Sequence, residues 1–491
     1  MIRVDTIIKK YPDGAAALFF IQIFSTLAYS VLYVTLVLFS IQALHLSAIQ
    51  ANHIMATFVA FNFALHLIGG FFGGRYLSFR FLFLIGMVLQ TIGCLLIAEV
   101  NIHSFMLGMA IFLVGSGMDL PCMNCMVTQL YQPHDHRREY AFLWNYSGMN
   151  IGFFIGITIA GIFQTQRDFN MLFSLTAITS VIALILMLIN WKKLHDVGTQ
   201  LTNPGVSHVK RGIFAVIAIT MITIAIEYIL RNALFTSEII LVLGIVMALI
   251  VLYLLMTRED KHEKNKLTAY CILVVASLVF YTLYELIPMA LTLFLERNVD
   301  RRIGNFTVPT AWFLNINTAI IIFGCPLLAF ITEKLRKKGY RINIPIFFSV
   351  GLVLIGLAII VLPIGIHFAN AAGKTNIEWP AITYALLAFA EIALSPIGYA
   401  LVGELAPPSL RGVLMGVWLL TSGVAAILSN VFSNIALGVK QALSPLISNA
   451  SYSHTFFMLG ITGIIVGIIL FLLKPILVKL MRHDPLMTMN D

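Results

Sequence analysis

Long apolar stretches, separated by short polar loops, follow one another along almost the whole chain. A helix needs about 20 apolar residues to cross the hydrocarbon core of a bilayer, and fourteen stretches are long enough. Because the number is even, both termini are expected on one side of the membrane. The predicted transmembrane helices cover residues 15–40, 48–74, 81–100, 104–130, 140–164, 170–190, 212–231, 236–256, 267–295, 309–332, 344–367, 379–404, 413–437 and 454–480.

Basic residues in the loops predict the orientation of these helices. Lysine and arginine are enriched in cytoplasmic loops of membrane proteins. With a cytoplasmic N-terminus, 24 of the 31 lysines and arginines lie on the inner side and 7 on the outer side. Losing or adding one span would destroy this bias, so the sequence predicts that both termini lie in the cytoplasm.

The composition agrees with a multi-pass membrane protein. Of 491 residues, 59% are hydrophobic and only 11% are charged, whereas about a quarter of a soluble domain is charged. The net charge of +9 resides in short loops, so we expect no nucleic-acid partner. The five cysteines all lie in apolar stretches, which argues against an extracellular disulfide framework.

Two polar stretches, 192–211 and 257–266, flank a pair of spans that carry no recognisable site residues. We therefore predict a six-helix bundle over 1–191, a linker with two additional spans over 192–266, and a second six-helix bundle over 267–491. Basic loops at equivalent places in the two bundles suit the parallel halves of a major facilitator fold. The expected fold class is all-α.

Glu285 and Glu391 each stand alone in an apolar span. A carboxylate at membrane depth costs ~2.5–3.5 kcal/mol even on lenient insertion scales, so it is rarely accidental. Such a group usually faces a water-filled cavity, binds a cation or carries a proton. The two acids therefore indicate a transporter.

Several segments, each in an expected span or in a loop beside one, together resemble the proton-dependent oligopeptide transporter (POT) family of the major facilitator superfamily. The similar segments are GSGMDLP (115–121), YSGMNIGFFIG (146–156), FYTLYELIP (280–288), LFLERNVDR (293–301), PTAWFLNIN (309–317) and AEIALSPIG (390–398). The resemblance implies a proton-coupled peptide transporter working by alternating access. It also implies two extra central helices, which are usual in bacterial members.

The chain departs from the family pattern in the first helix. The charged ExxER motif of the family aligns here with Gln22, Ser25 and Thr26, which are neutral. The fourth-helix lysine of the family aligns with Leu120, which has Asp119 beside it. The cationic side of the family's pocket is therefore missing while the anionic side is kept, and we expect weaker recognition of a free carboxylate.

The resemblance assigns roles to the acids. Glu391 is similar to the residue that binds the amino group of a peptide, and Ser395, in the following Ser-Pro pair, is expected to loosen the helix. Glu285 resembles a protonation site. Asp119 is either a replacement acid for proton coupling, a new partner for a cation, or a residue that faces elsewhere. A structural hydrogen bond between helices remains the alternative for both glutamates.

Polar and aromatic positions complete the predicted binding site. Asn150 and Asn317 match family positions that hydrogen-bond peptide backbone groups. Tyr29, Tyr33 and Trp312 are expected to line the cavity. Polar residues also join membrane helices and aromatic residues also pack, so a purely structural role stays open for all five.

No cofactor or metal is expected. Cys122 and Cys125 have CxxC spacing, but they lie in an apolar helix without a second ligand pair. There is no phosphate-binding loop and no visible nucleophile–base pair, so an enzyme or a nucleotide-driven pump is not expected.

The sequence thus predicts a secondary active transporter in a bacterial inner membrane. Its substrates would be di- or tripeptides, or a related small solute with an amino group, and its partners protons and the lipid bilayer. Two alternatives stay open. One is an uncoupled facilitator or exporter of another small solute, and the other is a receptor that binds ligand without transport.

Overall fold

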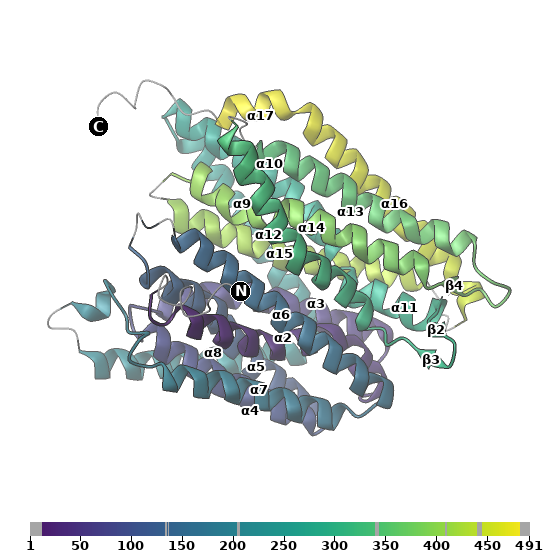
Figure 1. Cartoon of the computed structure of the whole chain (residues 1–491), viewed down its shortest axis with the longest axis horizontal. Coiled ribbons are helices and arrows are strands. Elements are labelled where there is room, and N and C mark those ends of the chain that lie inside the picture. The colour runs from purple at the N-terminus through teal and green to yellow at the C-terminus, as the bar shows by residue number, and fades with distance from the viewer. Residues whose placement is uncertain are drawn as a thin grey trace, which may run out of the picture. The chain divides into compact units, whose positions relative to one another are not determined.

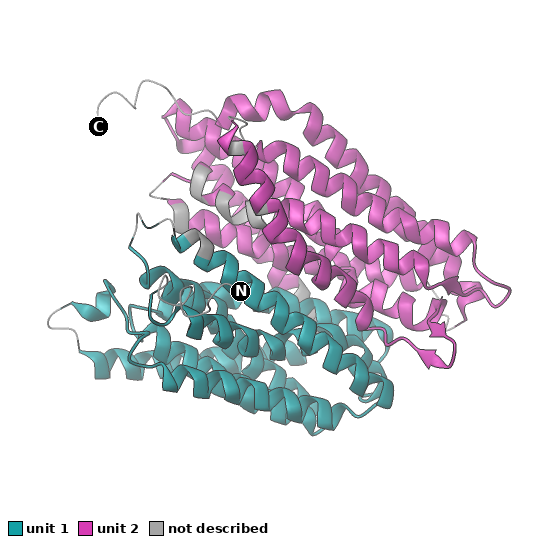
Figure 2. Ribbon diagram, viewed as in Figure 1, with its two compact units in different colours: residues 1–236 teal, residues 237–491 magenta. Residues whose placement is uncertain are grey.

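The structure is a computed structural model that describes residues 12–132, 135, 137–203, 207–338, 343–407, 410–438 and 444–481. The described chain is helical apart from short loops and four two-residue strands (Figure 1). It divides into two compact units, residues 1–236 and 237–491 (Figure 2). The division falls inside α9 (Ala233–Thr257), within the pair of spans predicted between the bundles.

Each apolar stretch predicted to span the membrane is occupied by helix. Thirteen helices of the described chain are long and apolar enough to cross a bilayer. The remaining predicted span corresponds to α14 (Glu378–Leu405), whose side chains at 395–400 lie outside the described residues. The expectation of an all-helical membrane protein is therefore confirmed.

The first unit packs its helices through close backbone approaches. Its helices are α2 (Ala15–Gln42), α3 (Ala48–Phe72), α4 (Phe79–Ala98), α5 (Ile102–Gln129), α6 (Arg137–Gln166), α7 (Phe169–Ile189), the short η1 (Gln200–Thr202) and α8 (His208–Arg231). Between α4 and α5, a Cβ on Gly93 would lie 2.7 Å from the Gly108 carbonyl oxygen. Likewise, a Cβ on Gly115 would lie 2.5 Å from the Gly86 carbonyl oxygen. Small residues at such crossings let membrane helices gain van der Waals contact.

The second unit holds the other helices and all four strands. Its helices after α9 are α10 (Lys261–Tyr284), η2 (Ile287–Leu291), α11 (Thr292–Asn298), α12 (Trp312–Lys337), α13 (Ile344–His367), α14, α15 (Arg411–Leu437), α16 (Pro445–Leu472) and α17 (Lys474–Met481). The antiparallel strands β2 (Arg302–Ile303) and β3 (Phe306–Thr307) form a hairpin. The parallel strands β1 (Val299–Asp300) and β4 (Thr375–Asn376) join two loops.

The span predicted over 267–295 is confirmed by Lys261–Asn298, which is long and apolar enough to cross a bilayer, but its helix is not regular throughout. Regular helix ends at Tyr284, a π-helical turn follows at Ile287–Leu291, and α11 begins at Thr292. Pro288 supplies the physical reason, since it has no N–H to donate to the carbonyl of Tyr284, four residues earlier. Instead, the amide of Leu291 donates to the carbonyl of Leu286 at 2.9 Å, a spacing of five residues.

The last predicted span, 454–480, starts and ends too late. Its helix begins at Pro445 rather than at 454, and it ends at Leu472. The polar residues in its first turns made this part look like a loop. In the fold they are used, because the Asn298 side-chain amide donates to Ser448 Oγ and Asn449 Oδ1, each at 2.8 Å.

Candidate functional site

Glu391 receives a hydrogen bond from a tyrosine of another helix. The Tyr284 hydroxyl, on the last residue of α10, donates to Oε2 of Glu391 in α14 at 2.6 Å. Hydroxyl bonds to a carboxylate are typically this short. The ring of Phe280, one turn earlier in α10, stacks on the Tyr284 ring with the planes 14° apart. The stacking of Phe280 thus holds the tyrosine ring in place.

A third helix reaches the same carboxyl oxygen. The side-chain nitrogen of Asn317, in α12, lies 3.5 Å from Oε2 of Glu391 and donates a long hydrogen bond to it. Asn317 is buried, whereas Glu391 is half-buried. No hydrogen bond found in the described chain reaches Oε1 of Glu391. The arrangement therefore fixes one oxygen of the carboxyl.

The sequence predicted Glu391 and Asn317 as site residues, and the structure brings them together. The sequence did not predict Tyr284 as a member of the site. A signal was present, because Tyr284 lies inside the motif FYTLYELIP, directly before the predicted acid Glu285.

Glu285 lies at the point where α10 gives way to the π-helical turn. It is 4% exposed, and its amide donates to the carbonyl of Tyr281 at 2.9 Å. Consecutive helical residues point about 100° apart, so Glu285 faces a different direction from Tyr284 and Glu391. Single π-helical turns are frequent at functional sites. The two predicted acids are therefore connected through the end of α10, because Tyr284, which bonds to Glu391, directly precedes Glu285.

Ser395 and Trp312 lie on the same helices as Glu391 and Asn317, respectively. Ser395 is in α14, one turn beyond Glu391, and its side chain lies outside the described residues. Trp312 is the first residue of α12, and its ring centroid lies 5.8 Å from that of Phe306 in the β2–β3 hairpin. Five residues of helix, about 7 Å, separate it from Asn317. Its cavity-lining role stays a prediction.

Tyr29 and Tyr33 form an aromatic cluster in the first unit. Their ring centroids are 5.9 Å apart along α2. Phe58 of α3 stacks on Tyr29 at 5.4 Å, and Phe153 of α6 meets both tyrosines edge-on. Tyr29 is half-buried and Tyr33 is buried. The sequence predicted both tyrosines as cavity-lining residues but gave no sign of the two phenylalanines.

Asn150 uses part of its amide within its own helix. Its side-chain nitrogen donates to the carbonyl of Tyr146 at 2.9 Å, and the residue is buried. An asparagine side chain has two donor hydrogens and one acceptor oxygen. One donor is thus committed, and the remaining groups are available to another partner.

A neutral hydrogen-bond chain occupies the first-helix positions where the family has charges. Asn145 of α6 donates to Oε1 of Gln22 at 3.0 Å, and the Gln22 amide donates to the Thr26 hydroxyl at 2.6 Å. All three residues are buried. An amide can donate and accept at once, so this chain joins α2 to α6 without a charge. Asn145 was not identified from the sequence.

Asp119 faces the first helix. It is buried in α5, near the side chains of Ser25 in α2 and Gln90 in α4. In the described chain its Oδ1 has no hydrogen-bond partner, and the Ser25 hydroxyl donates to the carbonyl of Gln22 at 3.3 Å. Ser25 is one of the positions that align with the family's charged motif. The role of Asp119 in proton coupling stays a prediction.

Comparison with known proteins gives the family. Residues 77–444 match the model of the POT family. A dipeptide and tripeptide permease A of Klebsiella pneumoniae (strain 342) is 28% identical over 481 residues, which cover 97% of this chain and 94% of the relative. The protein of the same name from Cronobacter turicensis is 27% identical over 483 residues, with 97% and 95% covered.

Solved structures show the same fold. The crystal structure of peptide transporter POT in complex with sulfate is similar with a TM-score of 0.83 and 24% identity, over 96% of each chain. A POT family transporter in complex with 5-aminolevulinic acid gives a TM-score of 0.82 at 24% identity, over 96% of this chain and 97% of that one. The expected major facilitator fold is thus confirmed, and the chain belongs to the POT family of membrane transporters.

Proposed function

We propose that this protein is a secondary active transporter of di- and tripeptides, or of a related small solute with an amino group. Two curated relatives of nearly full length are named dipeptide and tripeptide permeases. The loop charges support an inner-membrane location with both termini in the cytoplasm. The domain organisation would be two bundles, 1–191 and 267–491, joined by the two-helix linker 192–266.

The hydrogen bond from Tyr284 to Glu391 carries this proposal. A substrate ammonium that leaves water needs a carboxylate partner, because an unpaired charge at membrane depth is costly. Tyr284 fixes Oε2, so Oε1 is presented to the ammonium without a search over rotamers. Asn317 adds a polar group beside the same carboxyl, suited to a peptide carbonyl or amide. The remaining predicted binding residues, Asn150, Tyr29, Tyr33, Trp312 and Ser395, would line the substrate path.

Glu285 and Asp119 are the proposed proton sites. Glu285 shares the end of α10 with Tyr284, so a shift of this segment on protonation would move the donor that positions Glu391. A ligand or proton shifts a conformational equilibrium only if it favours one state over the other. Here the two states would differ in how the π-helical turn holds Glu285.

An uncoupled facilitator is favoured by one observation. Gln22, Thr26 and Asn145 form a neutral chain in the place of the family's charged motif. The arginine of that motif, which the family resemblance associates with proton coupling, is replaced here by Thr26. Coupling would then be weaker than in ordinary members, and it would depend more on Asp119.

Uptake into proteoliposomes tests the transport proposal. Labelled dialanine should accumulate, and Glu391→Gln should reduce its uptake at least tenfold, while N-acetyl-dialanine, which has no ammonium, should be a poor substrate for both proteins. Glu378→Gln is the matched control, since Glu378 is an exposed glutamate at the start of the same helix. Unchanged uptake in Glu391→Gln would remove the ammonium role, and binding without any flux would support a receptor.

An imposed pH gradient separates coupled from uncoupled transport. Coupled transport accumulates the peptide above the external concentration when the outside is acidic, whereas a facilitator only equilibrates it. Glu285→Gln should abolish accumulation and retain exchange of peptide for peptide.

A further inference from the structure

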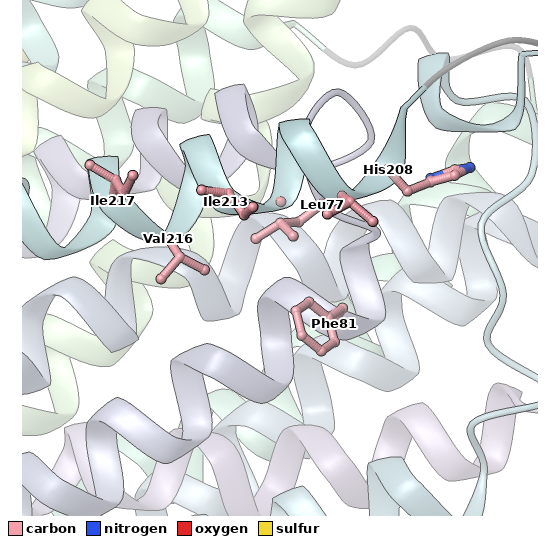
Figure 3. Close-up of a pocket in the computed structure, with 8 residues that line it drawn as sticks. Leu77, Phe81, His208, Ile213, Val216 and Ile217 are labelled. Atoms are coloured by element: carbon pink, nitrogen blue, oxygen red, sulfur yellow. The ribbon is translucent and has the colours of Figure 1, made fainter.

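An apolar groove lies between the start of α4 and the start of α8 in the first unit (Figure 3). Its volume is about 500 Å³, and it is lined by Leu77, Phe81, His208, Val209, Gly212, Ile213, Val216 and Ile217. Leu77 forms the buried floor, while Ile213 and Ile217 are more than half exposed. In a membrane-spanning helix such exposed side chains face acyl chains, so the groove opens towards lipid.

A polar pocket continues the groove at its loop end. It has a volume of about 350 Å³ and shares Leu77, Phe81 and His208 with the groove. Its other lining residues include Arg80, His195, Asp196 and Thr202. Together, the apolar groove and the polar pocket match an amphiphilic molecule, which has an apolar tail and a polar head.

The chain segments around the polar end are basic, while the pocket itself is lined by one arginine, Arg80, and one acid, Asp196. The segments 75–80 and 192–211 contain six lysines and arginines and a single acid, Asp196. The carboxyl of Asp196 already accepts the Phe79 amide at 3.0 and 3.2 Å, so it caps the start of α4. Arg80 and His195 lie close enough to offset its charge. The surrounding segments therefore carry a net positive charge, which favours an anion.

Arg80 is held in place for such a role. Its guanidinium lies over the Trp191 ring, 4.2 Å from the centroid, and one nitrogen donates to the Trp191 carbonyl at 2.6 Å. Its Nε is buried, and no hydrogen-bond partner was found for it in the described chain. The guanidinium is thus fixed by stacking, and a planar guanidinium matches the geometry of a phosphate.

We propose that this surface binds one anionic phospholipid of the inner leaflet, with an acyl chain in the groove and its phosphate at the basic pocket. Basic pockets between membrane helices on the cytoplasmic side are known to hold acidic lipid head groups. The loop charges place this end of the unit on the cytoplasmic side. The ligand would fasten α8, the first helix of the linker, against α4.

Gly212 keeps the groove open and provides a steric test. A Cβ at this position would meet only Cδ2 of Leu77, at 3.8 Å, so a larger side chain fits without moving the backbone. Gly212→Leu should fill the slot and leave the fold intact. Ala225→Leu is the control, because Ala225 is exposed on the same helix, about 20 Å away.

Native mass spectrometry of the purified protein in detergent measures the binding directly. One dioleoylphosphatidylglycerol should be retained at concentrations at which dioleoylphosphatidylcholine is lost. Gly212→Leu should weaken this binding about tenfold, and Ala225→Leu should leave it unchanged. The double variant Lys210→Gln/Arg211→Gln should weaken it by roughly fivefold per charge removed. The double variant Lys474→Gln/Lys479→Gln removes the same charge elsewhere and should have no effect.

Other results would overturn the proposal. Equal retention of both lipids would show that charge plays no part. Displacement by glycerol phosphate as effective as by the whole lipid would point to a free anion. Full binding by Gly212→Leu, with an unchanged thermal unfolding midpoint, would exclude the groove. A lipid-free dimer lost in Gly212→Leu would mean that a second copy covers this face.

Discussion

The Tyr284 hydroxyl lies 2.6 Å from Oε2 of Glu391, so the end of α10 fixes a carboxyl that α14 carries. The next residue along the chain is Glu285, followed at once by the π-helical turn. The proposed substrate site and the proposed proton site are therefore joined by one short segment, Tyr284–Leu291. Movement of this segment would change both sites together.

Tyr284→Phe should raise the KM for dialanine about tenfold or more and change the maximal rate less. A hydrogen bond to a charged group is worth about 1.5–3 kcal/mol, and 1.4 kcal/mol is a factor of ten. Tyr270→Phe is the control on the same helix, since the Tyr270 hydroxyl donates to the Leu414 carbonyl, in another part of the unit. Initial rates of uptake measure both values, and an unchanged KM would contradict the role given to Tyr284.

Pro288→Ala should lower uptake severalfold without lowering the thermal unfolding midpoint. Alanine restores the N–H that can bond to the Tyr284 carbonyl, so regular helix becomes favourable and the π-helical turn is lost. Glu285 and Tyr284 would then rotate relative to α11. Pro363→Ala makes the same change inside α13 and should retain uptake. A fall in uptake that merely follows loss of folded protein would argue against a functional π turn.

Asp119→Asn should reduce accumulation driven by a pH gradient while peptide exchange continues. The amide keeps the size of the carboxyl and its contact with Ser25, but it cannot take up a proton. Ser25→Ala tests the contact alone and should have the smaller effect. If Asp119→Asn accumulates peptide as the wild type does, Asp119 is a structural group.

Gly115→Ala should destabilise the first unit, by roughly 1–3 kcal/mol, as overpacked cores usually are. Its Cβ would lie 2.5 Å from the Gly86 carbonyl oxygen, so α4 and α5 would have to separate. Gly70→Ala is the control, because a Cβ there has no neighbour within 4 Å. Thermal unfolding in detergent compares the two, and equal midpoints would contradict the predicted clash.

Because of the Asp196 carboxyl, the free energy of unfolding should fall as the pH rises. Burial raises the pKa of its carboxyl from the ordinary 3.8, so the folded chain holds this proton more tightly than the unfolded chain. The contribution to stability is therefore present at acid pH and is lost as the pH rises through the folded pKa. In Asp196→Asn, the thermal unfolding midpoint should fall less over this pH range than it does in the wild type. A steeper dependence in the variant would contradict the sign.

Much of the fold was readable from the chain itself. The length of each apolar stretch sets a span, because backbone groups in lipid must be satisfied within a helix. The helix ends were harder where polar residues fall inside a helix, as at Ser448 and Asn449, whose partner Asn298 lies about 150 residues away. The π-helical turn was missed because hydropathy is the same for a regular and a bulged helix.

By itself, the sequence determined a multi-pass helical membrane protein, its family resemblance, and the acids Glu285 and Glu391 as its unusual groups. Only the tertiary structure decided which side chains meet. It placed the Tyr284 hydroxyl on Glu391, 107 residues apart, and turned Asp119 towards Ser25. The physical reason is that composition and spacing fix where a helix lies in the membrane, whereas helix packing and local backbone geometry fix the direction in which each side chain points.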